Sequence, residues 1–511
     1  MTDLFGGHPE TTPLSDRTDV TFLDTTLRDG EQAPGVSLAA AEKAEIARAL
    51  DRAGIGTIEA GSACTGPSER AAISQVVDED LDARVTSFAR GLRGDVDLAL
   101  DCGIDGINLV VPASDRHIEG KVETTREAVI ETTTELVAYA RDHGLWVEVL
   151  GEDGSRADLD FLAGLMERAL DAGAHRVCYC DTVGHATPEH TLEAVSALAD
   201  LGPTSTHVHD DLGLAVTNAL VSVAAGADLV HATVNGVGER AGNVAIEEVA
   251  VALAHGYGVD AVDTTALYDL ATRVADATGI ALAPNKAVVG ENAFTHESGI
   301  HTDGQLKDEA MYEPYSPELV GRERRLVLGK HAGAAGVRAA LAEHGVSVTE
   351  DELGTVVERV KELAERGTRV TDADLLAVVE DVRGEERERR IELVDLTATS
   401  GGRTPAASVR LAIDGTERVA AGTGSGPVDA AVAAVREALG PAADADLDAY
   451  HVDAITGGTD AVVTVAVEMS HDGRSVAVSA SDADITRASV TAMVDGLDRL
   501  LAADPRMPAD D

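Results

Sequence analysis

Lysine is nearly absent from this acidic chain. Only six of its 41 basic residues are lysines, and 90 aspartates and glutamates give a formal net charge of −49 at pH 7. So negative a surface repels phosphate backbones, which excludes nucleic acid as a partner. A charge of this size also repels itself unless salt screens it, and the Debye length falls to about 3 Å at 1 M salt. We therefore predict a halophilic protein from a salt-rich cytoplasm; an ordinary acidic protein is the alternative.

Cysteines, aromatic residues and long apolar runs are also scarce. The four cysteines all lie within the first 180 residues, which argues against a disulfide framework and suits a reducing compartment. Aromatic residues make up 3% of the chain, so its cores are expected to consist mainly of Ala, Val, Leu and Ile. No apolar run approaches the roughly 20 residues of a membrane span, and the N-terminus lacks the features of a signal peptide. A soluble cytoplasmic protein without membrane partners is expected.

From Asp19 to about residue 256, short apolar runs alternate with helical patterns. This alternation predicts parallel strands joined by crossover helices. Eight strands are expected, beginning at Val20, Thr57, Arg84, Gly106, Trp146, Arg176, Ser205 and Leu229. Eight is the number that closes a (β/α)8 TIM barrel, which is an α/β fold. We assign residues 1–18 to an N-terminal tail and residues 19–275 to the catalytic barrel.

The remainder of the chain shows two different patterns. Residues 276–390 mix loop signals with helices, and we assign them to helical linker subdomains that contribute to the active site. Residues 391–511 contain two predicted β-hairpins, with turns at Asp414-Gly415 and Asp472-Gly473, and each hairpin precedes a helical stretch. This repetition indicates an internally duplicated α+β domain. Several domains also fit the length of 511 residues, because single cores stop growing at about 300 residues.

Two histidines on the seventh predicted strand are the strongest candidates for metal ligands. His207 and His209 are two residues apart, so their side chains point to the same face of the strand. Asp29, in a polar turn after the first strand, offers a carboxylate at the same barrel mouth, where the active sites of such barrels lie. Two imidazoles and one carboxylate leave coordination positions open for a substrate. The alternative is a polar pair at the barrel mouth that binds no metal.

Two further segments are candidates for ligand binding. The loop Asn235–Asn243 carries three glycines among polar residues, and glycine permits close approach of a ligand to the backbone. A tight turn that Asn243 caps is the alternative. The segment Ala293–Gly304 contains two histidines, a glutamate and an aspartate with little helical periodicity. A solvated loop is the alternative interpretation of this second segment.

Four motifs together resemble the isopropylmalate, citramalate and homocitrate synthase family. They are DTTLRDGEQAPGVS (Asp24–Ser37), HVHDDLGLA (His207–Ala215), VNGVGERAGN (Val234–Asn243) and AFTHESGIHTDG (Ala293–Gly304). C-terminal segments such as GTGSGPVDAAV also look like the allosteric domain of that family. The resemblance implies a Claisen-type acyltransferase of branched-chain amino acid biosynthesis that joins acetyl-CoA, as co-substrate, to a 2-oxo acid. It further implies a divalent metal, a homodimer, and feedback inhibition by isoleucine or leucine; a domain that only stabilises the dimer is the alternative.

The same resemblance implies roles for individual residues. The expected metal ligands are Asp29, His207, His209 and Asn243. The 2-oxo acid is expected to contact Arg28 and Thr182, and the groups associated with proton abstraction from acetyl-CoA match Glu152, His301 and Tyr312. We predict that His301, oriented by Glu152, is the base, since proton abstraction requires a pKa near neutrality. The mixed nitrogen and oxygen ligands suit Zn, Mn or Co, and Mg less well.

Two positions bear on which 2-oxo acid is used. Many isopropylmalate synthases carry His where Asn108 stands and Ser where Leu150 stands, and Leu150 would shrink the pocket. The segment EAGSACTGPSER (Glu59–Arg70) also looks more like archaeal citramalate synthases. Pyruvate is therefore favoured, with 2-oxoisovalerate, the substrate of 2-isopropylmalate synthase, as the alternative. A lyase on the same barrel and a non-catalytic amino-acid sensor are the rival classes.

Overall fold

A computed structural model describes residue 17 and residues 19–365, 370, 372–383, 389–400, 404–440, 445–454, 463–471 and 474–502. Its contacts divide the chain into two compact units. The first unit comprises residues 1–294 and 313–324, and the second comprises residues 295–312 and 325–511. The chain therefore passes from one unit to the other three times.

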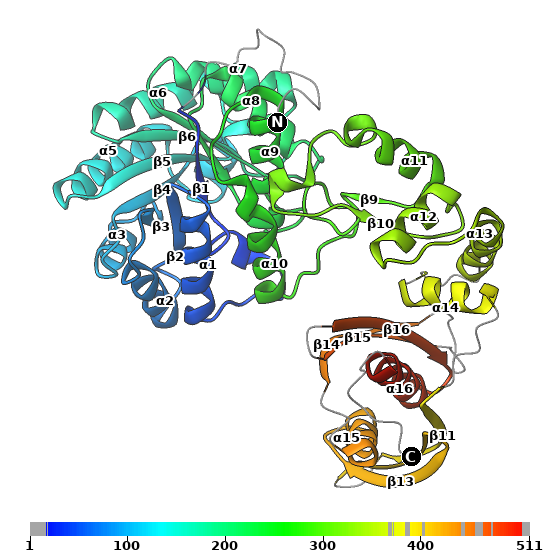
Figure 1. Ribbon diagram of the computed structural model, residues 1–511. Coiled ribbons are helices and arrows are strands. Elements are labelled where there is room, and N and C mark those ends of the chain that lie inside the picture. Colours follow the sequence, from blue (N-terminus) through cyan, green and yellow to red (C-terminus); the bar gives the residue numbers. More distant parts are fainter. Residues whose placement is uncertain are drawn as a thin grey trace. The chain divides into compact units, whose positions relative to one another are not determined.

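The first unit is built around a closed barrel of eight parallel strands (Figure 1). The strands are β1 (Thr21–Asp24), β2 (Thr57–Ser62), β3 (Arg84–Arg90), β4 (Gly106–Pro112), β5 (Trp146–Glu152), β6 (Arg176–Asp181), β7 (Thr204–Val208) and β8 (Leu229–Ala232). Neighbours pair in sequence order, and the barrel closes where Thr21 of β1 pairs with Leu229 of β8. The predicted (β/α)8 barrel is confirmed.

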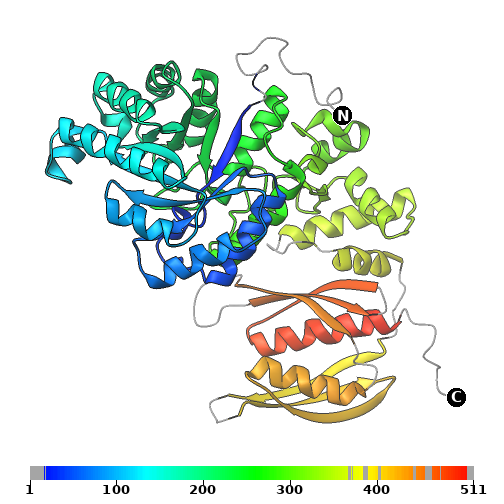
Figure 2. The ribbon, with the colours of Figure 1, turned by 90° about the vertical axis from the view of Figure 1, so that its left-hand side faces the viewer.

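Helices cover the outside of the barrel (Figure 2). They are α1 (Ala40–Arg52), α2 (Pro67–Val77), α3 (Arg93–Leu100), α4 (Asp115–Gly120), α5 (Arg126–Asp142), α6 (Leu159–Asp171), α7 (Pro188–Ala199), α8 (Ala215–Ala225), α9 (Ile246–Tyr257) and α10 (Leu267–Thr278). Side chains alternate along each strand, so residues such as Ile58, Ile107 and Val147 join the helices in one apolar core. The intervening residues point into the barrel, where they are available for chemistry.

The barrel interior holds a buried ion pair between β5 and β8. Nε2 of His231 lies 3.2 Å from both carboxylate oxygens of Glu148, and the Ser205 hydroxyl donates a hydrogen bond to the same carboxylate. Burial would raise the pKa of Glu148, but His231 holds it below its usual range. The His231 ring meets the His207 ring edge-on, with their centroids 5.4 Å apart. A buried ion pair therefore packs against the His207 ring.

The ladder between β1 and β2 is unusually short. It contains only the pairs Leu23 with Thr57 and Asp24 with Ile58. The register between β2 and β3 then shifts between Glu59 and Ser62. Beyond these points, side chains rather than ladder hydrogen bonds must hold the loop after β1 and the end of β2 together. Both segments carry candidate site residues.

The second unit begins with a small helical part. Its strands β9 (Thr295–His296) and β10 (Arg325–Leu326) pair in parallel. Its helices are α11 (Gly299–Lys307), α12 (Ala334–Glu343), α13 (Glu350–Glu365) and α14 (Asp372–Arg383). Leu328, Val337, Val356 and Leu375 belong to its separate core. The boundaries that the sequence predicts at residues 276 and 390 stay predictions.

Residues 391–502 contain the same arrangement twice. Three antiparallel strands precede a helix in each half: β11 (Ile391–Thr399), β12 (Ala406–Ile413), β13 (Thr416–Thr423) and α15 (Pro427–Leu439), then β14 (Asp446–Ala454), β15 (Val463–His471), β16 (Arg474–Asp482) and α16 (Ile485–Ala502). Both helices lie between the two sheets (Figure 2). Asp414 and Gly415 both have positive φ, as the turn between β12 and β13 requires. The predicted α+β class of this domain is confirmed; the turn expected at Asp472-Gly473 lies outside the described residues.

Most of the predicted tail of residues 1–18 also lies outside the described residues. Its described member, Arg17, donates hydrogen bonds from its guanidinium to the carbonyl groups of Val223 and Ala227. Within the described ranges, no helix is both long and apolar enough to cross a membrane.

Candidate functional site

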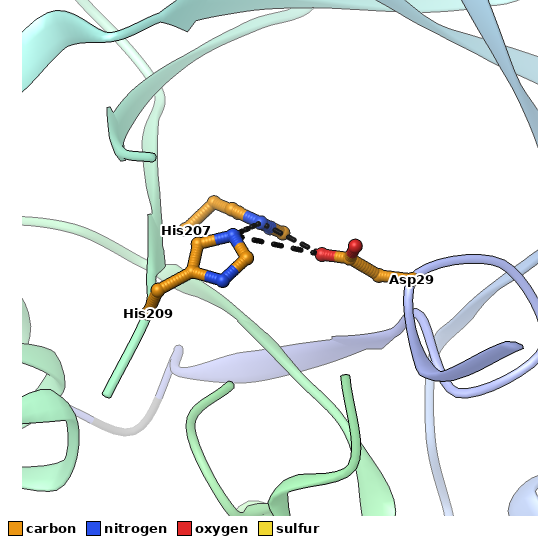
Figure 3. Close-up of side chains that lie close together, drawn as sticks. All are labelled: Asp29, His207 and His209. Carbon is orange, nitrogen blue, oxygen red and sulfur yellow. Dashed lines mark hydrogen bonds and ion pairs between the residues drawn. The ribbon is translucent and has the colours of Figure 1, made fainter. Parts of the chain in front are cut away.

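Asp29, His207 and His209 come together at the mouth of the barrel (Figure 3). Asp29 lies in the loop after β1, His207 in β7, and His209 directly after β7. Nε2 of His207 is 3.1 Å from Oδ2 of Asp29 and 3.3 Å from Nε2 of His209. Nε2 of His209 is 3.8 Å from the same Asp29 oxygen. Three of the predicted ligands thus direct one atom each toward a common point.

The electrostatics of this group suit a bound cation. Burial would raise the pKa of the Asp29 carboxyl, but Arg28, His207 and His209 lower it well below its usual range. Burial, together with the neighbouring His207, lowers the pKa of His209 to about 4. At neutral pH the site therefore presents an ionised carboxylate and a neutral imidazole, which are the protonation states that metal binding requires.

The spacing of the ligand atoms also fits a divalent metal. Among the described residues, none donates a hydrogen bond to Oδ2 of Asp29, although this oxygen is buried. A cation bound at about 2.0–2.2 Å by imidazole and carboxylate separates its ligand atoms by roughly 3–3.5 Å. The observed separations of 3.1, 3.3 and 3.8 Å lie close to this range. A second group with potential ligands, Glu148, Cys178 and His231, is instead accounted for by the ion pair between Glu148 and His231.

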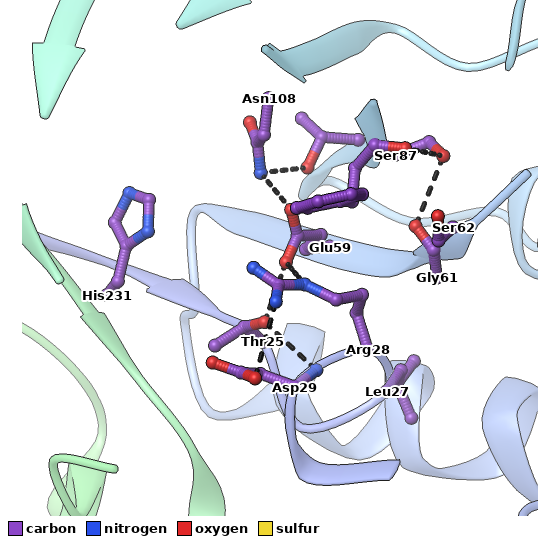
Figure 4. A network of polar contacts seen from close by, with 12 residues as sticks. Thr25, Leu27, Arg28, Asp29, Glu59, Gly61, Ser62, Ser87, Asn108 and His231 are labelled. Atoms are coloured by element: carbon purple, nitrogen blue, oxygen red, sulfur yellow. Dashed lines mark hydrogen bonds and ion pairs between the residues drawn. The ribbon is translucent and has the colours of Figure 1, made fainter. Parts of the chain in front are cut away.

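Arg28 connects Asp29, one of the three candidate metal ligands, to the end of β2 (Figure 4). Its Nε donates a hydrogen bond of 2.6 Å to Oε2 of Glu59, and its Nη1 lies 3.3 Å from Oδ1 of Asp29. Its guanidinium stacks over the Phe88 ring at 4.6 Å from the ring centroid. The guanidinium is thereby fixed beside the metal group, where it can bind a carboxylate.

Glu59 is the site residue that the sequence interpretation missed. Its Oε2 accepts hydrogen bonds from Arg28 and from the Thr25 hydroxyl at 2.7 Å, and its Oε1 accepts one of 2.7 Å from the Asn108 side chain. Asn108 also donates to Thr86 at 3.3 Å. The sequence marks Glu59 only as part of the segment Glu59–Arg70, which bears on the substrate. The available signal was a single charged residue in a strand without other charges, at a position that alternates inward.

A small apolar wall lies inside the barrel at β4, β5 and β6. It consists of Leu150, Cys178 and Cys180, with Val110 packed against them, and it is separate from the large core. Leu150 is only 2% exposed. The structure thus places the predicted pocket residue Leu150 in an apolar interior patch, whereas Asn108 belongs to the polar network around Glu59.

Three family models match consecutive parts of the chain. The HMGL-like model matches residues 19–274, the homocitrate synthase post-HMGL domain-like model matches residues 288–368, and the LeuA allosteric (dimerisation) domain matches residues 369–501. The (R)-citramalate synthase CimA of Methanocaldococcus jannaschii is 46% identical over 488 residues, which cover 94% of this chain and 99% of that protein. The chain belongs to the citramalate and isopropylmalate synthase family.

Other proteins extend this comparison. The putative (R)-citramalate synthase CimA of Methanothermobacter thermautotrophicus is 50% identical to this synthase over 486 residues, with 94% of this chain and 98% of that protein covered. Among solved structures, hydroxymethylglutaryl-CoA lyase from Pseudomonas aeruginosa is 23% identical, with a TM-score of 0.47 over 53% of this chain and 96% of that one.

The glycine-rich loop of the synthase brings Asn243 beside His209. The two residues form an isolated antiparallel bridge, and the Asn243 side chain donates a hydrogen bond to the carbonyl of Val237 at 3.3 Å. A Cβ atom on Gly238 would lie only 2.2 Å from that amide nitrogen, so a larger residue here would displace the Asn243 side chain. The loop is thus a tight turn around Asn243, and its predicted role as a fourth metal ligand stays a prediction.

Thr182 and Glu152 already have partners in the synthase. The Thr182 hydroxyl accepts a hydrogen bond of 2.8 Å from the backbone of Asp153. The Glu152 carboxylate binds Nζ of Lys121 at 2.6 Å and lies 3.1 Å from Nδ1 of His117. The sequence interpretation missed both of these basic partners, because they come from α4 and its following loop rather than from a strand end.

His301 and Tyr312 belong to the second unit of the synthase. Their ring centroids lie 4.4 Å apart, with an angle of 33° between the ring planes. Both side chains are exposed, Tyr312 by 41%. The structure therefore brings these two predicted catalytic residues together, and their roles stay predictions.

Proposed function

We propose that this synthase is an (R)-citramalate synthase that condenses acetyl-CoA with pyruvate. The observation that carries the proposal is the convergence of Asp29, His207 and His209 beside Arg28, in a barrel whose interior also holds the apolar wall that contains Leu150. The near full-length similarity to (R)-citramalate synthases supports the choice of substrate. 2-Isopropylmalate synthase remains the alternative, since one or two side chains change discrimination by only about 1–3 kcal/mol.

The first step is binding of the 2-oxo acid. Asp29, His207, His209 and, as we propose, Asn243 would hold a divalent metal. When bound, such a metal would polarise the keto carbonyl and stabilise negative charge on its oxygen. Arg28, fixed by Glu59, would bind the substrate oxygens with its planar set of donors. We propose that Thr182 contacts the substrate carboxylate, which requires its hydroxyl to donate while it accepts from Asp153.

The second step is removal of a methyl proton from acetyl-CoA. We propose that His301 accepts this proton, with Glu152 and Tyr312 as assisting groups. The ring contact between His301 and Tyr312 supports their acting together. Glu152 lies at the end of β5, at the barrel mouth. Its partners there are Lys121 and His117, which hold its carboxylate in place.

The test is release of free thiol from acetyl-CoA with pyruvate, 2-oxoisovalerate and 2-oxoglutarate measured side by side in concentrated KCl. Pyruvate is expected to give the highest kcat/KM. A higher kcat/KM with 2-oxoisovalerate would identify the protein as a 2-isopropylmalate synthase. Cleavage of citramalate without condensation would identify it as a lyase. If the folded, metal-loaded protein turned over none of the three acids, the result would indicate a non-catalytic amino-acid sensor.

Leu150 offers a test of substrate choice. Replacing Leu150 with Ser removes volume from the apolar wall and should enlarge the substrate pocket. The ratio of kcat/KM for 2-oxoisovalerate to kcat/KM for pyruvate should then rise by about 10-fold or more, because pocket changes of this kind are worth about 1–3 kcal/mol. The two kcat/KM values are measured on the same preparation. Leu98, a partly buried residue of α3 outside the barrel interior, is the control for a Leu to Ser change. An unchanged ratio in Leu150→Ser would show that Leu150 does not set specificity.

We propose further that the C-terminal domain holds two subunits together and binds isoleucine as a feedback inhibitor, with leucine as the alternative. The match to the LeuA allosteric (dimerisation) domain supports both parts of this proposal. Measuring activity at increasing concentrations of isoleucine and of leucine shows which of the two amino acids inhibits. If neither inhibits, the domain serves the dimer alone.

We also propose that the protein works in a salt-rich cytoplasm. With a net charge of −49, raising KCl from 0.1 to 2 M should increase the thermal midpoint by several degrees, because screening weakens repulsion in the folded state. Thermal unfolding at increasing KCl measures the effect. Choline chloride at equal ionic strength separates screening from binding of K⁺. A midpoint that falls as KCl rises would contradict the proposal.

A further inference from the structure

Lys43 is a fully buried lysine at the back of the metal site. It lies in α1, and its side chain has no exposed surface. Its Nζ donates a hydrogen bond of 2.9 Å to the carbonyl of Leu27 and contacts the carbonyl of Ala60 at 3.5 Å. Leu27 directly precedes Arg28, and Ala60 directly follows Glu59. One ammonium group therefore holds the backbone on both sides of the contact between Arg28 and Glu59.

Two carboxylates complete the surroundings of this ammonium group. Oε2 of Glu31 lies 2.7 Å from Nζ, and Oε1 of Glu69 lies 2.8 Å from it. The other Glu31 oxygen accepts the backbone N–H of Leu38 at 2.8 Å, and Oε1 of Glu69 accepts that of Ser62 at 3.2 Å. Glu31 thus anchors the loop after β1, and Glu69 anchors the end of β2. Lys43 joins these two anchors.

The contacts of Lys43 lie beyond the point where the hydrogen-bonded pairing of β1 with β2 ends. The pairing of β1 with β2 ends at Asp24 and Ile58, and the register with β3 shifts just after Glu59. The packing is close: a Cβ atom on Gly61 would lie 2.0 Å from the Glu69 carboxylate. Four oxygen atoms from four residues therefore replace, around one point charge, the hydrogen bonds that the strands do not make.

The choice of lysine over arginine supports a specific geometric role. The chain uses arginine for all but six of its 41 basic residues, yet it keeps lysine here. An ammonium group is compact and can be surrounded by acceptors, whereas a guanidinium is planar and larger. A fully buried charge is tolerated only when its partners are well placed, so the surroundings of Lys43 are tightly specified.

We propose that Lys43 is a positioning residue of the synthase: it fixes the loop that carries Arg28 and Asp29 against the end of β2 that carries Glu59. Its side chain is fully buried, and it acts through the backbone of Leu27 and Ala60. Its loss displaces Asp29 from His207 and His209 and rotates Arg28 away from the 2-oxo acid. The inference rests on the proposed function only for the identity of that acid.

The test compares three variants with the wild-type protein. Lys43→Arg keeps the charge and changes the geometry, Lys43→Met removes the charge, and Glu69→Gln weakens one anchor. The matched control is Arg48→Met: Arg48 lies on the same helix and pairs with Glu79 just after α2, on the surface and away from both loops. Each protein is measured for thermal midpoint, for affinity of the metal-free form for Co²⁺ by calorimetry, and for kcat and KM with pyruvate.

Lys43→Arg is expected to fold, to bind Co²⁺ about 10-fold more weakly or worse, and to raise KM for pyruvate about 10-fold, because misplaced supports of metal ligands cost about 10–100-fold. Glu69→Gln should show a smaller change in the same direction, and Arg48→Met should show none. If Lys43→Met does not fold, Lys43→Arg and Glu69→Gln decide the matter. The proposal is overturned if folded Lys43→Arg and Glu69→Gln lose only thermal stability while Co²⁺ affinity and KM stay at wild-type values.

Failure of the proposed function is recognised separately. A wild-type protein that does not turn over pyruvate contradicts the citramalate synthase proposal, yet the Co²⁺ affinities of the variants still decide the role of Lys43. Conversely, normal turnover of pyruvate by the wild-type protein and by the variants alike supports the proposed function. It contradicts the positioning role of Lys43.

Discussion

Replacing Asp29 with Asn is expected to lower kcat/KM by at least about 1,000-fold, which corresponds to about 4 kcal/mol of lost transition-state stabilisation. The substitution keeps the shape of the side chain and removes the charge that Arg28, His207 and His209 surround. The buried Oδ2 atom, which accepts no hydrogen bond from the described residues, is the atom that would bind the metal. An amide oxygen is a poorer ligand than a carboxylate, so metal affinity falls together with activity.

Thermal unfolding provides a readout that does not depend on turnover. A metal that binds only the folded protein stabilises it by RT ln(1 + [M]/Kd), so saturating Mn²⁺ or Co²⁺ should raise the thermal midpoint of the wild-type protein. This increase should disappear in Asp29→Asn. The control is Asp115→Asn, which removes an exposed carboxylate that pairs with Arg126. If Asp29→Asn retained both the metal-induced shift and its activity, the metal site would have to lie elsewhere.

The barrel and the grouping of Asp29 with His207 and His209 were predictable, because both follow from the sequence pattern of the strands. Strand positions follow from apolar runs, and two residues of separation places His207 and His209 on one face. Asp29 could be added because every parallel strand of a barrel ends at the same mouth. The structure bears out the strand count and closure, and it brings the three side chains within 3.8 Å of one another.

The supports of the site could not be predicted in the same way. Glu59 pairs with Arg28 across 31 positions, and Lys121 pairs with Glu152 across another 31. Such partners are chosen by how strand ends and helices pack, which local patterns do not encode. Lys43 illustrates the limit most clearly. Helical spacing places it on the buried face of α1 with Ile46, Ala47 and Leu50, but the sequence does not show which oxygen atoms surround its ammonium group.

Replacing His301 with Ala should nearly abolish condensation, with kcat lowered by about 100- to 10,000-fold, while binding of the 2-oxo acid is retained. The loss is that of a general base, whose contribution to rate typically lies in this range. In the proposed mechanism, binding of pyruvate depends on Arg28 and on the candidate metal ligands of the first unit, whereas His301 lies in the second unit beside Tyr312. The two functions should therefore separate.

The measurement pairs steady-state kcat with calorimetric binding of pyruvate to the metal-loaded protein. His344→Ala is the control, because His344 is a partly exposed histidine of the same unit that pairs with Asp372. Exchange of the methyl protons of acetyl-CoA with deuterium from solvent gives a finer test, since loss of the base should stop exchange as well as condensation. Full activity of His301→Ala would assign proton abstraction to another group, and Glu152, with Lys121 and His117 as its partners, would then be the next candidate.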